Sequence, residues 1–199
     1  MMQHLPECQL ILNKLKNELP ANLYYHSIDH TLDVYNSAKS IAKEEGVSDS
    51  ELKLLLVAAI YHDAGYLEQN HNHEQVSCEI AREYLPQFNY TQKEITLICG
   101  IIMATKIPQR PKTHLEKIIC DADLNYLGRT DFFDIGENLY QEMVAFGYIK
   151  NRDDWNRIQV DFMRQHHYFT PTAIKHNYSQ KEKNLAIVLS KTKIHDGKK

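Results

Sequence analysis

Cysteine is scarce in this chain, and the cysteines do not form a metal-binding or redox motif. The 199 residues include four cysteines, and none of them forms a CxxC pair. Isolated cysteines exclude the Cys-rich zinc motifs and the disulfide framework of a small secreted domain. Three of the four lie in apolar or helical contexts that suit small buried thiols. This usage favours a reducing compartment, and we expect a cytoplasmic protein.

Glycine, proline and long hydrophobic runs are also few. Seven glycines and six prolines are spread along the chain, which excludes a collagen-like or linker-rich organisation. No internal repeat or low-complexity block is present. Residues 1–19 mix charged side chains into their apolar positions, so they lack the continuous apolar segment of a signal peptide or a transmembrane helix. We therefore expect a globular protein without a membrane partner.

The chain has no large excess of charge of either sign. Lys and Arg number 23 against 26 Asp and Glu, which gives a net charge of −3. Without a broad cationic field, a protein does not attract nucleic-acid phosphates by counterion release, so an extended nucleic-acid partner is disfavoured. Hydrophobic residues make up 43% and charged residues 25%, values that disfavour a disordered chain.

Apolar residues recur at three- and four-residue steps along almost the whole chain, and no segment shows the sustained alternation of a strand. Pro20 and Gly46 end two of these stretches. The predicted helices cover roughly 5–19, 27–45, 48–60, 76–85, 91–105, 115–120, 135–146, 155–162 and a last stretch through 185–189. The pattern predicts an all-α single-domain bundle of about eight or nine helices.

Histidine, in contrast, is abundant, with 11 residues. His62 and Asp63 are adjacent and directly follow the most apolar predicted helix, 52–60. An imidazole nitrogen and a carboxylate oxygen at one point are ligands for a divalent transition metal, although a helix end with a solvated Asp is the simpler interpretation of this pair alone. His30 lies upstream and Asp123 downstream, so four groups from three helices can close a metal site.

Three segments around these residues resemble, in order, the His, His-Asp and Asp blocks of the HD-domain superfamily of metal-dependent phosphohydrolases. They are residues 25–34 (YHSIDHTLDV), 59–66 (AIYHDAGY) and 120–128 (CDADLNYLG). The resemblance covers about residues 24–130 and agrees with the all-α prediction. The region from Arg152 onward resembles the C-terminal part of small stand-alone bacterial members. We therefore expect one HD domain over residues 1–199, with the helices of 131–199 packed on the motif-bearing core.

Carried onto this sequence, the resemblance implies that His30, His62, Asp63 and Asp123 bind a divalent metal ion, with Mn, Fe, Co, Ni, Zn and Mg all open. It further implies that Asp63 holds or deprotonates a metal-bound water. We place the fourth ligand at Asp123, and we expect Asp121 to support a ligand from behind or to end the helix.

Residues 71–77 (HNHEQVS) resemble a His-Glu-x-x-Ser stretch that follows the His-Asp pair in many members of the superfamily. In members with two metals, a histidine here and another at the end of the following helix complete the second site. Thr105 stands where that second histidine is expected, which favours one tight metal site and at most a weak second one. His73 and Glu74 would then orient a water or contact the substrate, unless they only form a polar helix start.

Phosphoester hydrolysis depends on positioning and charge stabilisation, which predicts cations near the substrate. Lys106 and Arg129 follow two of the site segments and are the phosphate-binding candidates, although each also fits an ordinary surface cation. Thr105 either donates a hydrogen bond to phosphate or only ends its helix. His26, one turn before the first predicted ligand, faces either the same opening or water.

The remaining histidines carry no partner pattern. One of His166 and His167 is expected to pack against Tyr168 and Phe169, and the other either packs as well or faces the cleft, so their role stays open. We expect solvated side chains at His4, His114, His176 and His195.

The ordered ligand set predicts a metal-dependent phosphohydrolase, which uses a metal-activated water to hydrolyse a phosphate ester of a nucleotide or another small phosphorylated metabolite. Two alternatives stay open. A di-iron oxygenase of the same fold needs six protein ligands, and Thr105 argues against it. A non-catalytic nucleotide-sensing module is disfavoured by the complete ligand set. The expected partner is the small phosphorylated substrate, and a homo-oligomer is left open.

Overall fold

The computed structural model describes residues 4–192, and every regular element in that range is a helix. The nine α-helices of the described range are α1 (Pro6–Glu18), α2 (Ile28–Glu44), α3 (Asp49–Tyr61), α4 (His73–Tyr84), α5 (Gln92–Ala104), α6 (His114–Asp123), α7 (Phe132–Ala145), α8 (Arg152–Gln165) and α9 (Pro171–Thr192). Three short 3₁₀ helices join some of them: η2 (Ala64–Leu67), η3 (Leu85–Phe88) and η4 (Asn125–Gly128). The prediction of an all-α bundle is confirmed.

Local signals set several helix ends. The Thr91 hydroxyl accepts the Glu94 N–H while the Glu94 carboxylate accepts the Thr91 N–H, so α5 begins at a full capping box. The Ser48 hydroxyl likewise accepts the Glu51 N–H at the start of α3. Gly46 has a φ of 71°, the left-handed conformation that ends the path of α2. These ends depend on residues a few positions apart, which is why the sequence predicts them.

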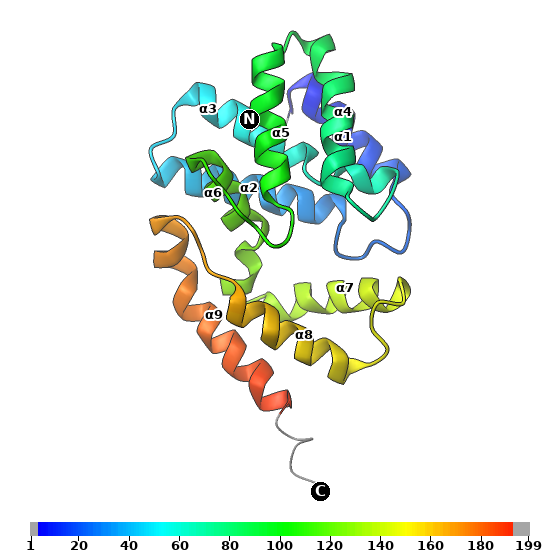
Figure 1. The fold of residues 1–199 in the computed structure, drawn as a ribbon, viewed down its shortest axis with the longest axis vertical. Helices are drawn as coiled ribbons and strands as arrows, with labels where there is room; N and C mark the ends of the chain where they lie inside the picture. The colour runs from blue at the N-terminus through cyan, green and yellow to red at the C-terminus, as the bar shows by residue number, and fades with distance from the viewer. Residues whose placement is uncertain (1–3, 193–199) are drawn as a thin grey trace, which may run out of the picture.

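The helices are arranged around two hydrophobic clusters. In Figure 1, helices α1 to α6 lie above α7 and α8. Helices α1 to α6 surround the larger cluster, and α3 runs through it with every residue from Leu54 to Tyr61 buried. Helices α7, α8 and α9 form the lower part of the molecule and share a smaller cluster around Leu127, Phe132 and Met163. The turn after α3 and the end of α6 thus lie where the two clusters approach each other.

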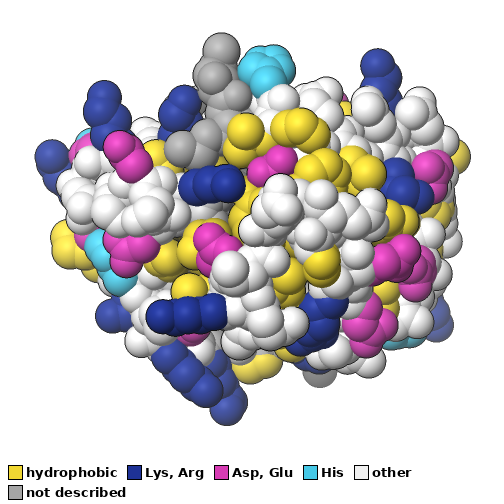
Figure 2. Space-filling view, turned by 90° about the horizontal axis from the view of Figure 1, so that it is seen from above, with side chains coloured by type: hydrophobic (Ala, Val, Ile, Leu, Met, Phe, Trp, Pro, Cys, Tyr) yellow, Lys and Arg dark blue, Asp and Glu magenta, His cyan; other side chains and the backbone are white. Residues whose placement is uncertain are grey.

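The surface carries charges of both signs. On the face drawn in Figure 2, Lys and Arg side chains are interspersed with Asp and Glu side chains. Among residues 4–192, no helix combines the length and the apolar character needed to cross a lipid bilayer.

Candidate metal centre

Four side chains from three helices converge between the two clusters. His30 comes from the first turn of α2, His62 and Asp63 follow α3, and Asp123 is the last residue of α6. Asp63 Oδ2 lies 3.2 Å from His62 Nε2 and 3.5 Å from His30 Nε2. Asp123 Oδ1 lies 3.3 Å from His30 Nε2 and 3.7 Å from His62 Nε2. The structure therefore brings all four predicted ligands together.

These ligand atoms fit a divalent ion. Two atoms that each bind an ion at about 2.1 Å lie about 3.0 to 3.4 Å apart at octahedral or tetrahedral angles, close to the separations of 3.2 to 3.7 Å seen here. Within the described part of the chain, His30 Nε2, His62 Nε2 and Asp63 Oδ2 are buried and have no hydrogen-bond partner. Such atoms are rare and costly, and a shared cation would satisfy all three.

Neighbouring groups orient the two histidines. His62 Nδ1 lies 2.9 Å from the Ala59 carbonyl oxygen, so Nδ1 donates and the lone pair of Nε2 faces the other ligands. The Tyr25 ring lies against His30, with ring centroids 4.5 Å apart. Ligand orientation is therefore built into the fold.

The turn that carries His62 and Asp63 is held against α4. The Ser77 hydroxyl donates to the His62 carbonyl oxygen at 2.7 Å and accepts the Gly65 N–H at 2.8 Å. A Cβ atom on Gly65 would lie 2.0 Å from the His73 carbonyl oxygen, so no other residue allows this approach. The Ser of the HNHEQVS stretch thus keeps the start of α4 beside the metal ligands.

Charge and burial act in opposite directions on these ligands. Burial lowers the pKa of His62, but the Asp63 and Asp123 carboxylates outweigh burial and raise it to about 9. Burial alone would raise the pKa of Asp63, yet the surrounding histidines, His62 first, hold it far below its usual range. A proton and a metal ion therefore compete for the same imidazole nitrogen.

His73 and Glu74 lie beside the centre and not in solvent. His73 Nε2 is 3.4 Å from Asp63 Oδ1 and 3.6 Å from Glu74 Oε1. The Thr105 hydroxyl donates to the Ile102 carbonyl oxygen at 2.8 Å, the helix-ending role that the sequence left open. Asp63 thus has one oxygen toward His30 and His62 and the other toward His73.

Glu142, on α7, is a site residue that the sequence reasoning missed. Its carboxylate accepts the N–H groups of Tyr25 and His26 at 2.9 and 3.0 Å, and its second oxygen pairs with His26 Nδ1. Burial lowers the pKa of His26, but the bond to Glu142 and the charges of Asp63 and Asp123 together outweigh burial, so the pKa is raised. Glu142 follows Leu139 by three positions and lies on the predicted apolar face of the helix. A charged residue on an apolar face is the sequence feature that could have identified Glu142 as a site residue.

His26 faces the centre and not water. Its Nε2 lies 3.2 Å from the Tyr66 hydroxyl. The Tyr66 ring stacks on both His26 and His73, with centroid distances of 4.3 and 4.1 Å. The Tyr66 ring therefore contacts both histidines, whose own ring centroids lie 6.0 Å apart.

The structure does not bring the two predicted phosphate-binding cations to the site. Arg129 Nη1 donates to both Asp33 carboxylate oxygens at 2.7 Å, and its other nitrogens bind Asp131 at 2.5 and 2.9 Å. Lys106 is exposed and donates to Asn72 Oδ1 at 2.8 Å. Two carboxylates neutralise Arg129, and the Lys106 ammonium is bonded to Asn72, the residue before α4.

The other histidines lie outside the centre. His166 is half-buried, its ring lies 4.7 Å from that of Tyr168, and burial lowers its pKa to about 3. His167 is exposed beside Phe169. Exposed side chains are also found at His4, His114 and His176, the last two within reach of a glutamate, and His195 lies outside the described residues.

Asp121 faces away from the ligands. Its carboxylate is fully buried and accepts the N–H groups of Phe169 and Thr170, both at 2.8 Å, and the Thr170 hydroxyl at 2.6 Å. It ties the connection between α8 and α9 to α6. Of the two carboxylates in the DAD stretch, Asp123 is the one that joins the ligand cluster.

We expect Asp121→Ala to lower the free energy of unfolding by about 3 kcal/mol, because it leaves two N–H groups and a hydroxyl buried without partners. Urea unfolding measures this loss, with Asp134→Ala, an exposed aspartate on α7, as the control. The folded fraction should keep its metal content. Loss of metal with unchanged unfolding would contradict the assignment.

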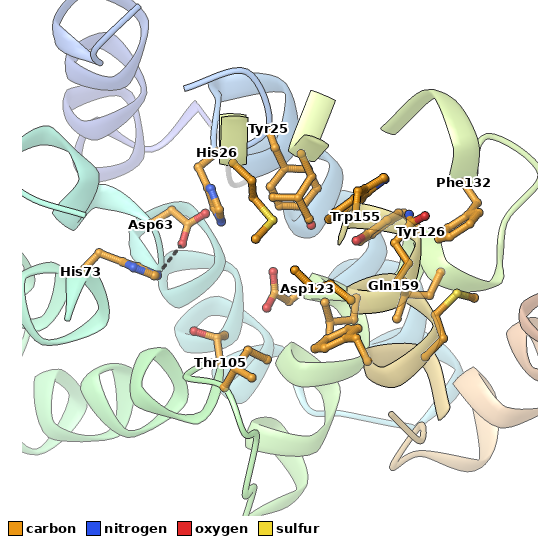
Figure 3. A pocket seen from close by; sticks show the side chains of 18 of the residues that line it. Tyr25, His26, Asp63, His73, Thr105, Asp123, Tyr126, Phe132, Trp155 and Gln159 are labelled. Atoms are coloured by element: carbon orange, nitrogen blue, oxygen red, sulfur yellow. Dashed lines mark ion pairs between the residues drawn. The ribbon is translucent and has the colours of Figure 1, made fainter. Parts of the chain in front are cut away.

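A cavity of about 260 Å³ opens beside the centre. Polar side chains line one end of it: His26, Asp63, His73, Glu74, Thr105 and Asp123. The other end is formed by η4, α7 and α8 and includes Tyr126, Phe132 and Trp155 (Figure 3). The centre therefore adjoins a partly open cavity large enough for a small molecule.

Fold and site together define a helical protein with a buried His-His-Asp-Asp cluster. Residues 27–124 match the family model of the HD domain, and the chain is an HD-domain protein. HD domains bind divalent metals, in agreement with the cluster.

Two known proteins are similar to the chain. One is the crystal structure of a predicted HD superfamily hydrolase from an uncultured Thermotogales bacterium. The match covers 96% of this chain and 92% of the chain in that structure, with a TM-score of 0.62 and 20% sequence identity, and it shows a similar fold. An uncharacterized protein from Clostridium beijerinckii is 36% identical over 76 residues, which are 37% of this chain. The match spans 48% of that protein, about half of its length.

Removing the ion should destabilise the protein. A ligand that binds only the folded state at about 100 times its Kd stabilises it by about 2.7 kcal/mol, or roughly 5 to 10 °C in Tm for a chain of this size. We expect a chelator to lower the Tm of the metal-loaded protein by this amount and added Mn²⁺ to restore it. An equal response of the Asp123→Asn variant in a thermal scan would place the ion elsewhere.

Proposed function

We propose that this protein is a metal-dependent phosphohydrolase that cleaves a phosphate ester of a small metabolite with a metal-activated water. The observation that carries the proposal is the set of buried ligand atoms of His30, His62 and Asp63 that lack partners and lie beside a cavity. The family match and the description of the Thermotogales structure as a predicted HD superfamily hydrolase support it.

His30, His62, Asp63 and Asp123 would hold the ion. A bound divalent ion lowers the pKa of its water from about 15.7 toward about 7 and offsets the charge of the phosphate. Asp63 would act from both oxygens, because Oδ2 faces the ligand histidines while Oδ1 is directed toward His73. Asp63 Oδ1 is therefore the group that orients the attacking water and accepts its proton.

His26 is the candidate proton donor for the leaving oxygen. Glu142 holds its Nδ1 and its backbone N–H, and its Nε2 lies on the cavity side near Tyr66. In the proposed step, the water oxygen bonds to phosphorus, the bond from phosphorus to the ester oxygen breaks, and that oxygen takes a proton from His26. The products are an alcohol and inorganic phosphate.

The arrangement disfavours the two alternative functions. The Thr105 hydroxyl is bonded to its own helix and supplies no further ligand for a second iron. All four proposed ligands are present, and the cavity is open to them. A module that only senses a nucleotide and catalyses no reaction does not require a complete set of metal ligands. We accordingly propose one tight metal site, with His73 and Glu74 as the groups nearest to a weaker second position.

Phosphate release by the metal-loaded protein tests the proposal. The chain would be loaded separately with Mn²⁺, Fe²⁺, Co²⁺, Ni²⁺, Zn²⁺ or Mg²⁺ and incubated with a panel of phosphate monoesters that includes nucleotides and deoxynucleotides. We expect metal-dependent release that a chelator abolishes and added metal restores. Oxygen consumption without phosphate release would overturn the proposal in favour of the oxygenase.

A further inference from the structure

The cavity beside the metal centre has two chemically different ends. The metal ligands and their polar neighbours occupy one end, and the other is built from side chains of η4, α7 and α8 (Figure 3). At this far end the lining includes Leu127, Phe132, Trp155, Phe162 and Met163, and most of it is apolar or aromatic. A substrate group that extends from the ion toward α7 and α8 therefore contacts mostly apolar and aromatic side chains.

Apart from its histidines, of which His26 is paired with Glu142, the described lining of the cavity has no cationic side chain. Of the described residues that line it, none is Lys or Arg, whereas Asp63, Glu74 and Asp123 bring carboxylates. Arg129 is neutralised by two aspartates, and Lys106 is directed to Asn72 at the surface. A second or third phosphate of a nucleotide would be buried here without a counter-charge, which is strongly unfavourable.

Hydrogen-bonding capacity at the far end is equally small. Gln159 supplies the one amide among the described lining residues there, Trp155 adds one indole N–H, and the Tyr126 hydroxyl interacts with Tyr25. A nucleobase and its sugar carry several donors and acceptors, and each one buried without a partner costs about 1 to 3 kcal/mol. The far end thus selects against a nucleoside.

We propose that the organic group of the substrate is apolar, a small alkyl, prenyl or aryl group that lies between α7 and α8 while its phosphate lies at the metal centre. This inference rests on the proposed phosphohydrolase function and narrows its substrate class. The volume of about 260 Å³ is near the lower limit for small-molecule sites, so the group is small and the substrate is a monoester. Hydrolysis releases a hydrophobic alcohol and inorganic phosphate.

A chain-length series tests this substrate class. The Mn²⁺-loaded protein would be assayed with straight-chain alkyl phosphates from methyl to octyl, with phenyl phosphate, and with AMP and dAMP. We expect kcat/KM to rise about fourfold for each added methylene, which corresponds to about 0.8 kcal/mol, until the cavity is filled. The nucleotides should fall at least about 100-fold below the best alkyl ester. A flat series or a preference for nucleotides would overturn the inference.

Two tryptophan variants on α7 form a matched pair. Leu139 lines the cavity, and its neighbour Asn138 is exposed. Leu139→Trp should lower kcat/KM for the longest esters at least about tenfold more than for methyl phosphate, because the new ring occupies the far end. Asn138→Trp should change neither value. An identical response of the two variants would count against the proposed position of the organic group.

Binding of alkyl phosphonates separates failure of this inference from failure of the proposed function. These analogues have no ester bond, and calorimetry measures their affinity for the Mn²⁺-loaded protein. If affinity rises with chain length while no ester is hydrolysed, the apolar subsite stands and the phosphohydrolase function fails. If esters are hydrolysed but phosphonate affinity is independent of chain length, the function stands and the apolar subsite fails.

Discussion

Replacing Asp63 with asparagine is expected to remove the bound metal ion and to lower phosphate release by more than about 100-fold, the loss that follows even when only the supporting groups of a metal site are changed. Asp63 Oδ2 is buried and lies within 3.5 Å of both ligand histidines. An amide has the same shape but no charge, and its NH₂ group offers the ion no lone pair. Elemental analysis and a phosphate-release assay measure the two effects.

The matched control for this change is Asp134→Asn, at an exposed position of α7. It should keep both the metal and the activity of the parent protein. Thermal scans of the chelated proteins show whether Asp63→Asn still folds. If that variant retained one equivalent of metal with full activity, the centre would not contain Asp63 and the proposed function would lose its basis.

His26→Gln is expected to lower kcat for alkyl phosphates by about 10² to 10⁴, the usual contribution of a general acid. The loss should be small for 4-nitrophenyl phosphate, because 4-nitrophenolate is a stable anion that leaves without a proton. The reason lies in the position of His26, which Glu142 holds at the cavity with Nε2 turned toward the reacting end. Initial rates with the two ester types give the ratio directly.

Glu142→Gln offers a graded version of the same test, since it keeps an oxygen for the two backbone N–H groups but removes the charge paired with His26. It should move kcat in the same direction and with the same dependence on the leaving group. His114→Gln, at an exposed histidine, serves as the control. Equal losses for both ester types in His26→Gln would mean that His26 has a structural role alone.

The contribution of α7 gives the C-terminal helices a direct part in the site. Glu142 and the apolar residues Leu139 and Met143 all belong to this one helix. A truncated chain that ended with the match to the HD family at residue 124 would keep the metal ligands but lose the partner of His26 and the far wall of the cavity. The metal centre and the substrate cavity therefore depend on different parts of the sequence.

Much of the fold and of the metal centre was open to prediction from residue patterns. Helices follow from periodicity and from capping pairs such as Thr91 with Glu94, which act over a few positions. The ligands His30, His62, Asp63 and Asp123 stand in ordered blocks with distinctive neighbours. Local chemistry also set the turn after α3, where Gly65 alone permits the approach of His73.

Sequence reasoning did not reach interactions between distant segments. Sequence reasoning predicted that Arg129 binds phosphate, because no neighbouring residue in the sequence indicates that Asp33 pairs with Arg129. It left Glu142 unassigned because a charge on an apolar helix face has no visible partner until α7 meets the segment that carries His26. Lys106 was similarly ambiguous until the end of α5 placed it beside Asn72.

Residue order and neighbours alone were sufficient to identify the helical class and the family and to predict the four metal ligands, because these depend on short-range patterns. The contacts of Asp121 with the connection between α8 and α9, the pairing of His26 with Glu142 and the apolar end of the cavity required the folded chain. Each of these follows from the packing of α7, α8 and α9 against the metal-binding helices, and no local pattern encodes which side chains that packing brings together.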